Sequence, residues 1–145
     1  MSVPKIVVHT DVVVDHLCGN RRPSTLRLVM SKFFCYTTVF QAVELFALAR
    51  TDEEAAAVEA ALAAMKVLGL NAKSAPKYGK LVAAHRQRDR WNVMIAGLCI
   101  ESRLPILTDR SRDFAGIDML TVVPARSVVA ERTAEELVHA ARQHR

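Results

Sequence analysis

Short β-branched segments alternate with helical stretches along most of the chain, and this alternation limits the folds open to it. Strand-like segments are expected at Lys5–His9, Phe34–Thr37, Leu104–Thr108 and Met119–Val123. Strands that are separated by helices favour a parallel sheet covered on both faces. We therefore expect an α/β fold, a three-layer α/β/α sandwich with a mainly parallel sheet. In such sheets the functional crevice lies outside the carboxyl ends of the strands.

Capping signals place the intervening helices. Asp11 is expected to cap a helix from about Val12 to Cys18, and Thr38 with Gln41 to start an apolar helix that runs through Ala49. Further helices are expected to begin at Ser24, at Thr51, at Ser74, at Trp91 and at Thr133; the one from Thr51 carries Val58, Leu62 and Met65 and ends at Gly69.

Length and composition indicate one folded domain over residues 1–145, because a chain of 145 residues with only 5 Gly and 5 Pro has neither a linker nor a disordered tail. No apolar run approaches the roughly 20 residues that span a bilayer, and the first ten residues do not resemble a signal peptide. Three cysteines without a CxxC pair argue against a disulfide scaffold or a zinc site. We expect a cytoplasmic protein with no membrane partner.

The net charge of +5 is concentrated between Lys73 and Arg90, where Asp89 is the only acid. A basic segment of this kind attracts RNA or DNA. The same pattern also fits a solvated helix face or a site for an acidic protein.

Carboxylates near predicted strand ends are the remaining candidates for chemistry, because the sequence has no GxGxxG, GxxxxGK[ST], HExxH or GxSxG motif. Asp11 follows the first strand, Asp109 and Asp113 follow the Leu104–Thr108 strand, and Glu44 is the only acid in an apolar helix. Hard oxygen ligands of this kind suit Mg²⁺ or Mn²⁺, which can activate water beside a phosphodiester. The alternatives are a helix cap for Asp11, turn acids for Asp109 and Asp113, and an arginine partner or solvent for Glu44. For His9 we expect a strand-end histidine with a local hydrogen bond.

Four segments together resemble the PIN domain, specifically the small VapC-type ribonucleases of bacterial toxin–antitoxin pairs. They are Ile6–Leu17, Thr37–Leu45, Asn92–Gly97 and Leu104–Phe114, and the likeness extends from about Lys5 to Pro124. The first and third acids of the family fall on His9 and Asn92 here, and only Glu44 matches directly. The closing acid is either Asp113 or Asp109, and Asp11 lies two residues beyond the expected first acid.

The resemblance implies a metal-dependent endoribonuclease, the toxin of a type II pair, with Mg²⁺ or Mn²⁺ as cofactor. The implied residues fall into three sets: catalytic Asp11, Glu44, Asn92 and Asp113; metal-binding Asp11, Glu44, Asp109 and Asp113; substrate-binding Thr10, Thr108, Arg110, Arg112, Lys77, Lys80 and Arg86.

The implied partners are RNA, a small antitoxin protein and a second copy of the chain. The apolar Phe33–Leu48 region and Trp91 are the candidate protein contacts, unless they form core instead. Because two expected acids are replaced, the alternative is a catalytically degenerate PIN-like module that binds RNA or protein. A phospho-acceptor receiver domain is disfavoured, because no Asp follows Phe34–Thr37 and no Lys follows Val122–Val123.

Overall fold

A five-stranded parallel sheet forms the centre of the computed structural model, which describes residues 3–19 and 23–143. The strand order is β3-β2-β1-β4-β5, and every pairing is parallel. The strands are β1 (Lys5–Val8), β2 (Phe34–Thr38), β3 (Lys66–Leu68), β4 (Ile106–Thr108) and β5 (Val122–Pro124). The expected α/β class is confirmed, and the central pair β1–β4 joins segments about a hundred residues apart in the sequence.

Several of the helices begin where the sequence carries a side-chain cap. The helices are α1 (Thr10–Cys18), α2 (Thr25–Met30), α3 (Val39–Leu48), α4 (Asp52–Ala63), α5 (Ala75–Ala84), α6 (Arg90–Ser102) and α7 (Ala134–Gln143). The Thr38 hydroxyl accepts the Gln41 N–H, Thr51 does the same for Glu54, and the Asp89 carboxylate accepts the Asn92 N–H at 3.1 Å. Each cap satisfies a backbone donor that the helix itself leaves unpaired. None of these described helices is both long and apolar enough to cross a membrane.

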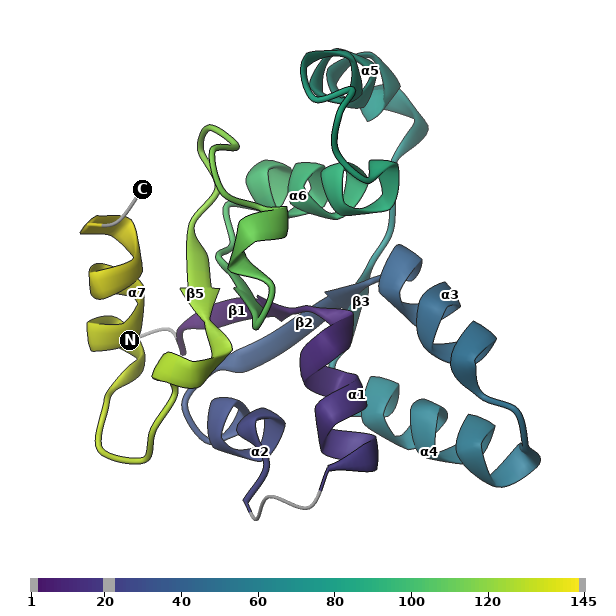
Figure 1. The fold of residues 1–145 in the computed structure, drawn as a ribbon, viewed down its shortest axis with the longest axis vertical. Helices are drawn as coiled ribbons and strands as arrows, with labels where there is room; N and C mark the ends of the chain where they lie inside the picture. The colour runs from purple at the N-terminus through teal and green to yellow at the C-terminus, as the bar shows by residue number, and fades with distance from the viewer. Residues whose placement is uncertain (1–2, 20–22, 144–145) are drawn as a thin grey trace.

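Side chains that alternate along the central strands fill two cores. Ile6 and Val8 face the layer that contains α1, α2, α4 and α7, whereas Val7 faces α6 and the loop after β4. All three are 0% exposed, as expected for strands covered on both faces. Figure 1 shows the resulting layers, with α6 on one side of the sheet and α1, α2 and α4 on the other.

Helix α5 lies on the far side of α6 from the sheet (Figure 1). Gly97 makes this contact possible, because a Cβ atom there would lie 2.1 Å from Cε1 of Tyr78. The Tyr78 side chain is buried against α6, and its hydroxyl donates a hydrogen bond to Glu101 Oε1 at 3.1 Å. Ser74 also donates to Glu101, at 2.6 Å, so α6 holds α5 at two points.

Three expectations about local structure are wrong. Helix α4 ends at Ala63 rather than at Gly69, because Lys66–Leu68 pairs with β2 as an edge strand. Asp11 does not cap α1: the helix starts at Thr10, His9 is its N-cap residue, and Asp11 lies within the first turn. The strand expected at Met119–Val123 is formed only by Val122–Pro124.

Candidate functional site

The carboxyl ends of β1 and β4 lie side by side and bring His9 and Thr108 to the same edge of the sheet. Val8 pairs with Leu107 in the register, and the His9 N–H donates to the Leu107 carbonyl at 2.9 Å. Because α1 follows β1 directly, its first turn also lies at this edge. The site is therefore built around Asp11 in that turn.

The Asp11 carboxylate is hydrogen-bonded by three donors from two parts of the chain. Oδ1 lies 3.1 Å from His9 Nδ1. Oδ2 accepts the Thr108 hydroxyl at 3.0 Å and the backbone N–H of Asp109 at 2.8 Å. Thr108 in turn accepts the Arg110 N–H at 2.9 Å. We call His9, Asp11 and Thr108 the edge network.

The environment of Asp11 favours its ionised form. Burial acts to raise the pKa of Asp11, but the hydrogen bond and charge of His9, with the donors from Asp109 and Thr108, lower it below its usual value. An ionised carboxylate can only accept hydrogen bonds. His9 Nδ1 must therefore carry the proton that it shares with Asp11. The expected local hydrogen bond of His9 is present.

His9 is enclosed on its other side. Its side chain is 8% exposed, and its ring meets the ring of Phe114 edge-on with the centroids 5.2 Å apart. Nε2 is buried, and within residues 3–19 and 23–143 it has no hydrogen-bond partner. Nε2 is therefore shielded from solvent, and rotation of the ring would gain it no hydrogen bond within the described residues.

Glu44 reaches the same edge from α3. The Thr10 hydroxyl donates to Glu44 Oε1 at 3.1 Å, so Thr10 and Asp11, neighbours in α1, each connect to a different element. One turn earlier in α3, the buried Gln41 donates its amide to the Val8 carbonyl and fixes α3 to the end of β1. From the sequence, Gln41 is expected only as a helix-start residue. Its spacing of four from the buried Leu45 was the signal that it faces inward.

Hydrogen bonds of backbone groups place Asn92, Asp113 and Asp109. Asn92 is half-buried in the first turn of α6, where its backbone N–H meets Asp89. Asp113 lies in the short 3₁₀ helix Ser111–Asp113, and its backbone carbonyl accepts Arg88 Nη1 at 3.0 Å. Asp109 contributes its backbone N–H to Asp11. Catalytic and metal-binding roles for these residues stay predictions.

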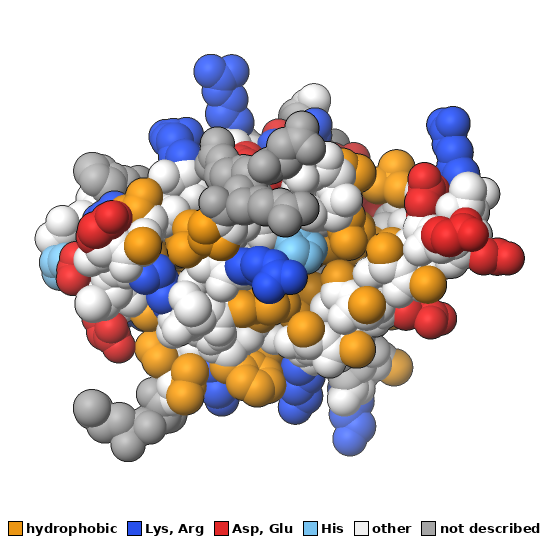
Figure 2. Space-filling view, turned by 90° about the horizontal axis from the view of Figure 1, so that it is seen from below, with side chains coloured by type: hydrophobic (Ala, Val, Ile, Leu, Met, Phe, Trp, Pro, Cys, Tyr) orange, Lys and Arg blue, Asp and Glu red, His pale blue; other side chains and the backbone are white. Residues whose placement is uncertain are grey.

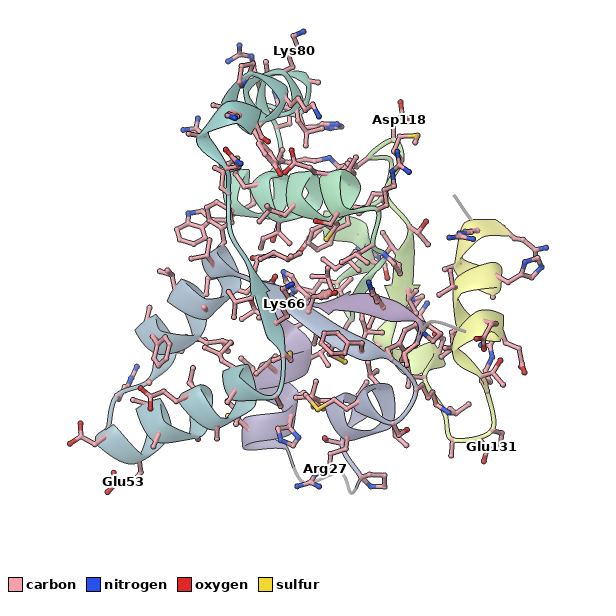
Figure 3. All side chains as sticks on the ribbon, turned by 180° about the vertical axis from the view of Figure 1, so that it is seen from behind. Arg27, Glu53, Lys66, Lys80, Asp118 and Glu131 are labelled. Carbon is pink, nitrogen blue, oxygen red and sulfur yellow. The ribbon has the colours of Figure 1, made fainter. Side chains whose placement is uncertain are left out.

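The predicted substrate-binding residues lie in separate places. Thr10 and Thr108 belong to the edge of the sheet, and Arg110 and Arg112 are exposed on the loop that follows β4. Lys77 and Lys80 are exposed on α5, with Arg86 just beyond its end. Figure 3 shows Lys80 at the outer end of the molecule, away from the sheet. A ligand that touches both groups would have to span α6.

The residues at this edge do not fit the Mg²⁺ or Mn²⁺ ion that the resemblance implies. Among the described residues, no group of three or more His, Cys, Asp or Glu side chains is placed to hold a metal ion. Both Asp11 oxygens are engaged by protein donors, and Glu44 accepts from Thr10. Mg²⁺ demands near-ideal octahedral geometry, so the donors already placed on these oxygens compete with its binding. We therefore derive no catalytic step through a metal.

The fold and the strand-end site define an α/β protein with an all-parallel sheet. Neither a family model nor a curated protein matches the sequence. Solved structures do match. A chain of the DNA-bound VapBC complex from Salmonella typhimurium aligns with a TM-score of 0.70 and 19% identity, covering 84% of this chain and 98% of that one. A chain of VapBC2 from Rickettsia felis, bound to a promoter DNA fragment, aligns with 0.69 and 17%, covering 83% and 98%.

A toxin–antitoxin complex from Klebsiella pneumoniae gives the same result, with a TM-score of 0.68, 19% identity, and coverage of 83% of this chain and 97% of the other. At these identities the likeness establishes the fold. The fold is that of the PIN domain, as in the VapC components of VapBC complexes, and the resemblance drawn from the sequence is confirmed at this level.

Proposed function

We propose that this chain is the PIN-fold, VapC-type component of a toxin–antitoxin pair, and that it acts by binding a protein partner rather than by metal-assisted hydrolysis. The fold likeness to chains of VapBC complexes supports the first half. The observation that carries the second half is the edge network, in which protein donors already engage both oxygens of Asp11. Of the two readings left open by the sequence, this geometry favours the degenerate binding module.

An exposed apolar strip on α3 supplies a surface for the partner. Val39, Val43 and Phe46 recur at helical spacing and are 39%, 50% and 41% exposed. Trp91, at the start of α6, is 42% exposed and meets Phe40 edge-on at 5.5 Å. Grouped apolar side chains at a surface mark interaction sites, and aromatic residues are the usual anchors. We call Val39, Val43, Phe46 and Trp91 the α3 strip.

The apolar surface continues beside α4. Figure 2 views the molecule from below and shows apolar side chains exposed on the right-hand side, with acidic side chains at its far end. Helix α4 carries this pattern, with exposed alanines after the acidic first turn of Asp52, Glu53 and Glu54. An antitoxin protein with an apolar segment is the occupant we propose, and a second copy of this chain is the alternative occupant.

The test is complex formation. The chain is co-expressed with the product of the adjacent gene, and the mass of the purified assembly is measured by light scattering. Val43→Glu should abolish the assembly without changing the melting temperature. Val129→Glu is the matched control, since Val129 is also exposed, at 39%, but lies outside the strip. The mass of the isolated chain tests the homodimer. A mass of two chains for the wild type and of one chain for Val43→Glu would assign the α3 strip to a second copy. Assembly that survives Val43→Glu would contradict the proposed surface.

The second candidate is the metal-dependent endoribonuclease. Glu44 favours it, because Thr10 holds this acid at the same edge as Asp11. Incubation of the chain with a structured RNA and Mn²⁺ separates the two candidates. The binding module predicts no cleavage above the level of Glu44→Gln. Cleavage that requires Mn²⁺ and disappears in Glu44→Gln would replace our proposal with the ribonuclease.

A further inference from the structure

We infer that His9 closes the strand-end site to divalent cations, because its imidazole engages one oxygen of the Asp11 carboxylate while Thr108 and Asp109 engage the other. The inference concerns the site itself and is independent of any protein partner.

His9 occupies a central position at this edge of the sheet. It is the residue that directly follows β1, at the centre of the sheet, with Leu107 of β4 bonded to its backbone. Any cation placed between Asp11 and the strand ends would therefore meet the imidazole. A ring nitrogen that donates a proton toward Asp11 repels a cation at that place, whereas an acid would attract it.

Both carboxylate oxygens of Asp11 already accept hydrogen bonds from the protein. Oδ2 of Asp11 has two donors at 2.8 and 3.0 Å, which account for both of its lone pairs. Oδ1 faces His9 Nδ1 at 3.1 Å. A metal at the remaining lone pair of Oδ1 would lie beside the N–H of His9, and the partial positive charge of that donor would oppose its binding.

Packing restricts the movement of the His9 side chain. The His9 side chain is 8% exposed and packs edge-on against Phe114, which is 1% exposed. Nε2 has no partner in the described part of the chain, and it remains buried. Moving the ring outward would therefore require Phe114 to move as well. A closed packing of this kind keeps the imidazole on Asp11.

The acidic side chains at this edge also bear on whether it can hold an ion. Without a carboxylate at position 9, no group of three or more His, Cys, Asp or Glu side chains among the described residues is placed to hold an ion at this edge, where Thr10 already donates to Glu44. His9→Asp removes the donor from Oδ1 and adds a carboxylate at the same strand end. His9→Asn is the matched control, because its amide keeps a donor near Asp11 and adds no charge.

The experiment titrates Mn²⁺ into the full chain and measures binding by calorimetry and by the loss of the free-ion electron paramagnetic resonance signal. We expect no saturable binding for the wild type or for His9→Asn. His9→Asp should bind Mn²⁺ with an affinity at least about tenfold higher than that of the wild type. The double variant His9→Asp with Glu44→Gln should lose this gain. A folded His9→Asp variant that binds no better than the wild type would overturn the inference.

A measurement on the wild type alone tests the inference even if the His9→Asp variant does not fold. Stoichiometric Mn²⁺ broadens the amide resonances of nuclei close to its site. We expect the amide signals of His9, Asp11 and Thr108, none of which is exposed, to remain sharp while nonspecific broadening affects only exposed acids. Selective broadening of these three signals would show that the edge binds the ion with His9 in place, and would overturn the inference.

Discussion

Asp11 and Thr108 are 97 positions apart in the sequence, and the Thr108 hydroxyl donates to Asp11 Oδ2 at 3.0 Å. The bond joins the first turn of α1 to the last residue of β4. It therefore fastens the N-terminal part of the sheet to its C-terminal part at the edge where a PIN-fold site is expected.

Asp11 should stabilise the fold in a pH-dependent manner. Folding lowers the pKa of Asp11, so the stabilisation is fully present above the unfolded value of about 3.9 and is lost as the pH falls through the lower folded value. At neutral pH, Asp11→Asn should reduce the free energy of unfolding by about 1–3 kcal/mol. Urea unfolding of both proteins should show this difference shrinking below about pH 4.

Asp118→Asn is the control for this series, because Asp118 is exposed on the loop before β5. Its free energy of unfolding should stay within about 0.5 kcal/mol of the wild type at neutral pH. A difference for Asp11→Asn that is as large in strong acid as at neutral pH would contradict the ionised state that we assign to Asp11.

The Thr108 hydroxyl should protect the loop that follows β4. It accepts the Arg110 N–H at 2.9 Å while donating to Asp11. Thr108→Val keeps the shape of the side chain and removes both bonds. We expect faster amide hydrogen exchange at Asp109 and Arg110 in Thr108→Val, and exchange close to that of the wild type in Thr108→Ser. Equal exchange in the valine and serine variants would show that the hydroxyl holds neither the Arg110 amide nor, through Asp11, the Asp109 amide.

Two glycines should respond in opposite directions to alanine. A Cβ at Gly97 would overlap the ring of Tyr78, whereas a Cβ at Gly79 meets nothing within 4 Å. Gly97→Ala should lower the free energy of unfolding by about 1–3 kcal/mol through overpacking. Gly79→Ala, on the exposed side of α5, should raise it by about 0.4–1 kcal/mol. Chemical denaturation measures both, and destabilisation by Gly79→Ala would contradict the described exposure of α5.

The basic residues of α5 stay the predicted contact for RNA, and any contribution that they make is expected to come from charge alone. Lys77 and Lys80 are exposed and lie on a helix whose first turn carries no acid. Lys77→Gln combined with Lys80→Gln should reduce the slope of log affinity against log salt by about 0.7 for each lysine on single-stranded RNA. Fluorescence anisotropy over a salt series measures the slope. An unchanged slope would mean that these lysines do not contact the RNA backbone.

The architecture was largely predictable because it depends on local patterns. A β-branched run marked β1 and a run of aromatic, Cys and Thr residues marked β2, and threonine or serine caps marked four helix starts. Strand β3 was missed because its residues Lys66 and Val67 are exposed at the sheet edge, and because the helical spacing of α4 continues to Met65. A three-residue edge strand has too little burial to leave a periodic signal.

The site was only partly predictable because its contacts are not local. Asp11 was a candidate because it follows a strand, and Glu44 because it is the only acid in an apolar helix. The structure brings both to one edge, and the expected local hydrogen bond of His9 is present. The sequence could not show that neutral donors from Thr108 and Asp109 would take the second oxygen of Asp11. That pairing depends on the register of β1 with β4, which spacing along the chain does not fix.

The most direct test of the account is a crystal of the full chain soaked in Mn²⁺ and measured at a wavelength where manganese scatters anomalously. The account predicts no anomalous peak at the strand-end edge, with His9 Nδ1 within hydrogen-bonding distance of Asp11. A peak about 2.2 Å from oxygens of Asp11 and Glu44, with the imidazole displaced, would contradict it.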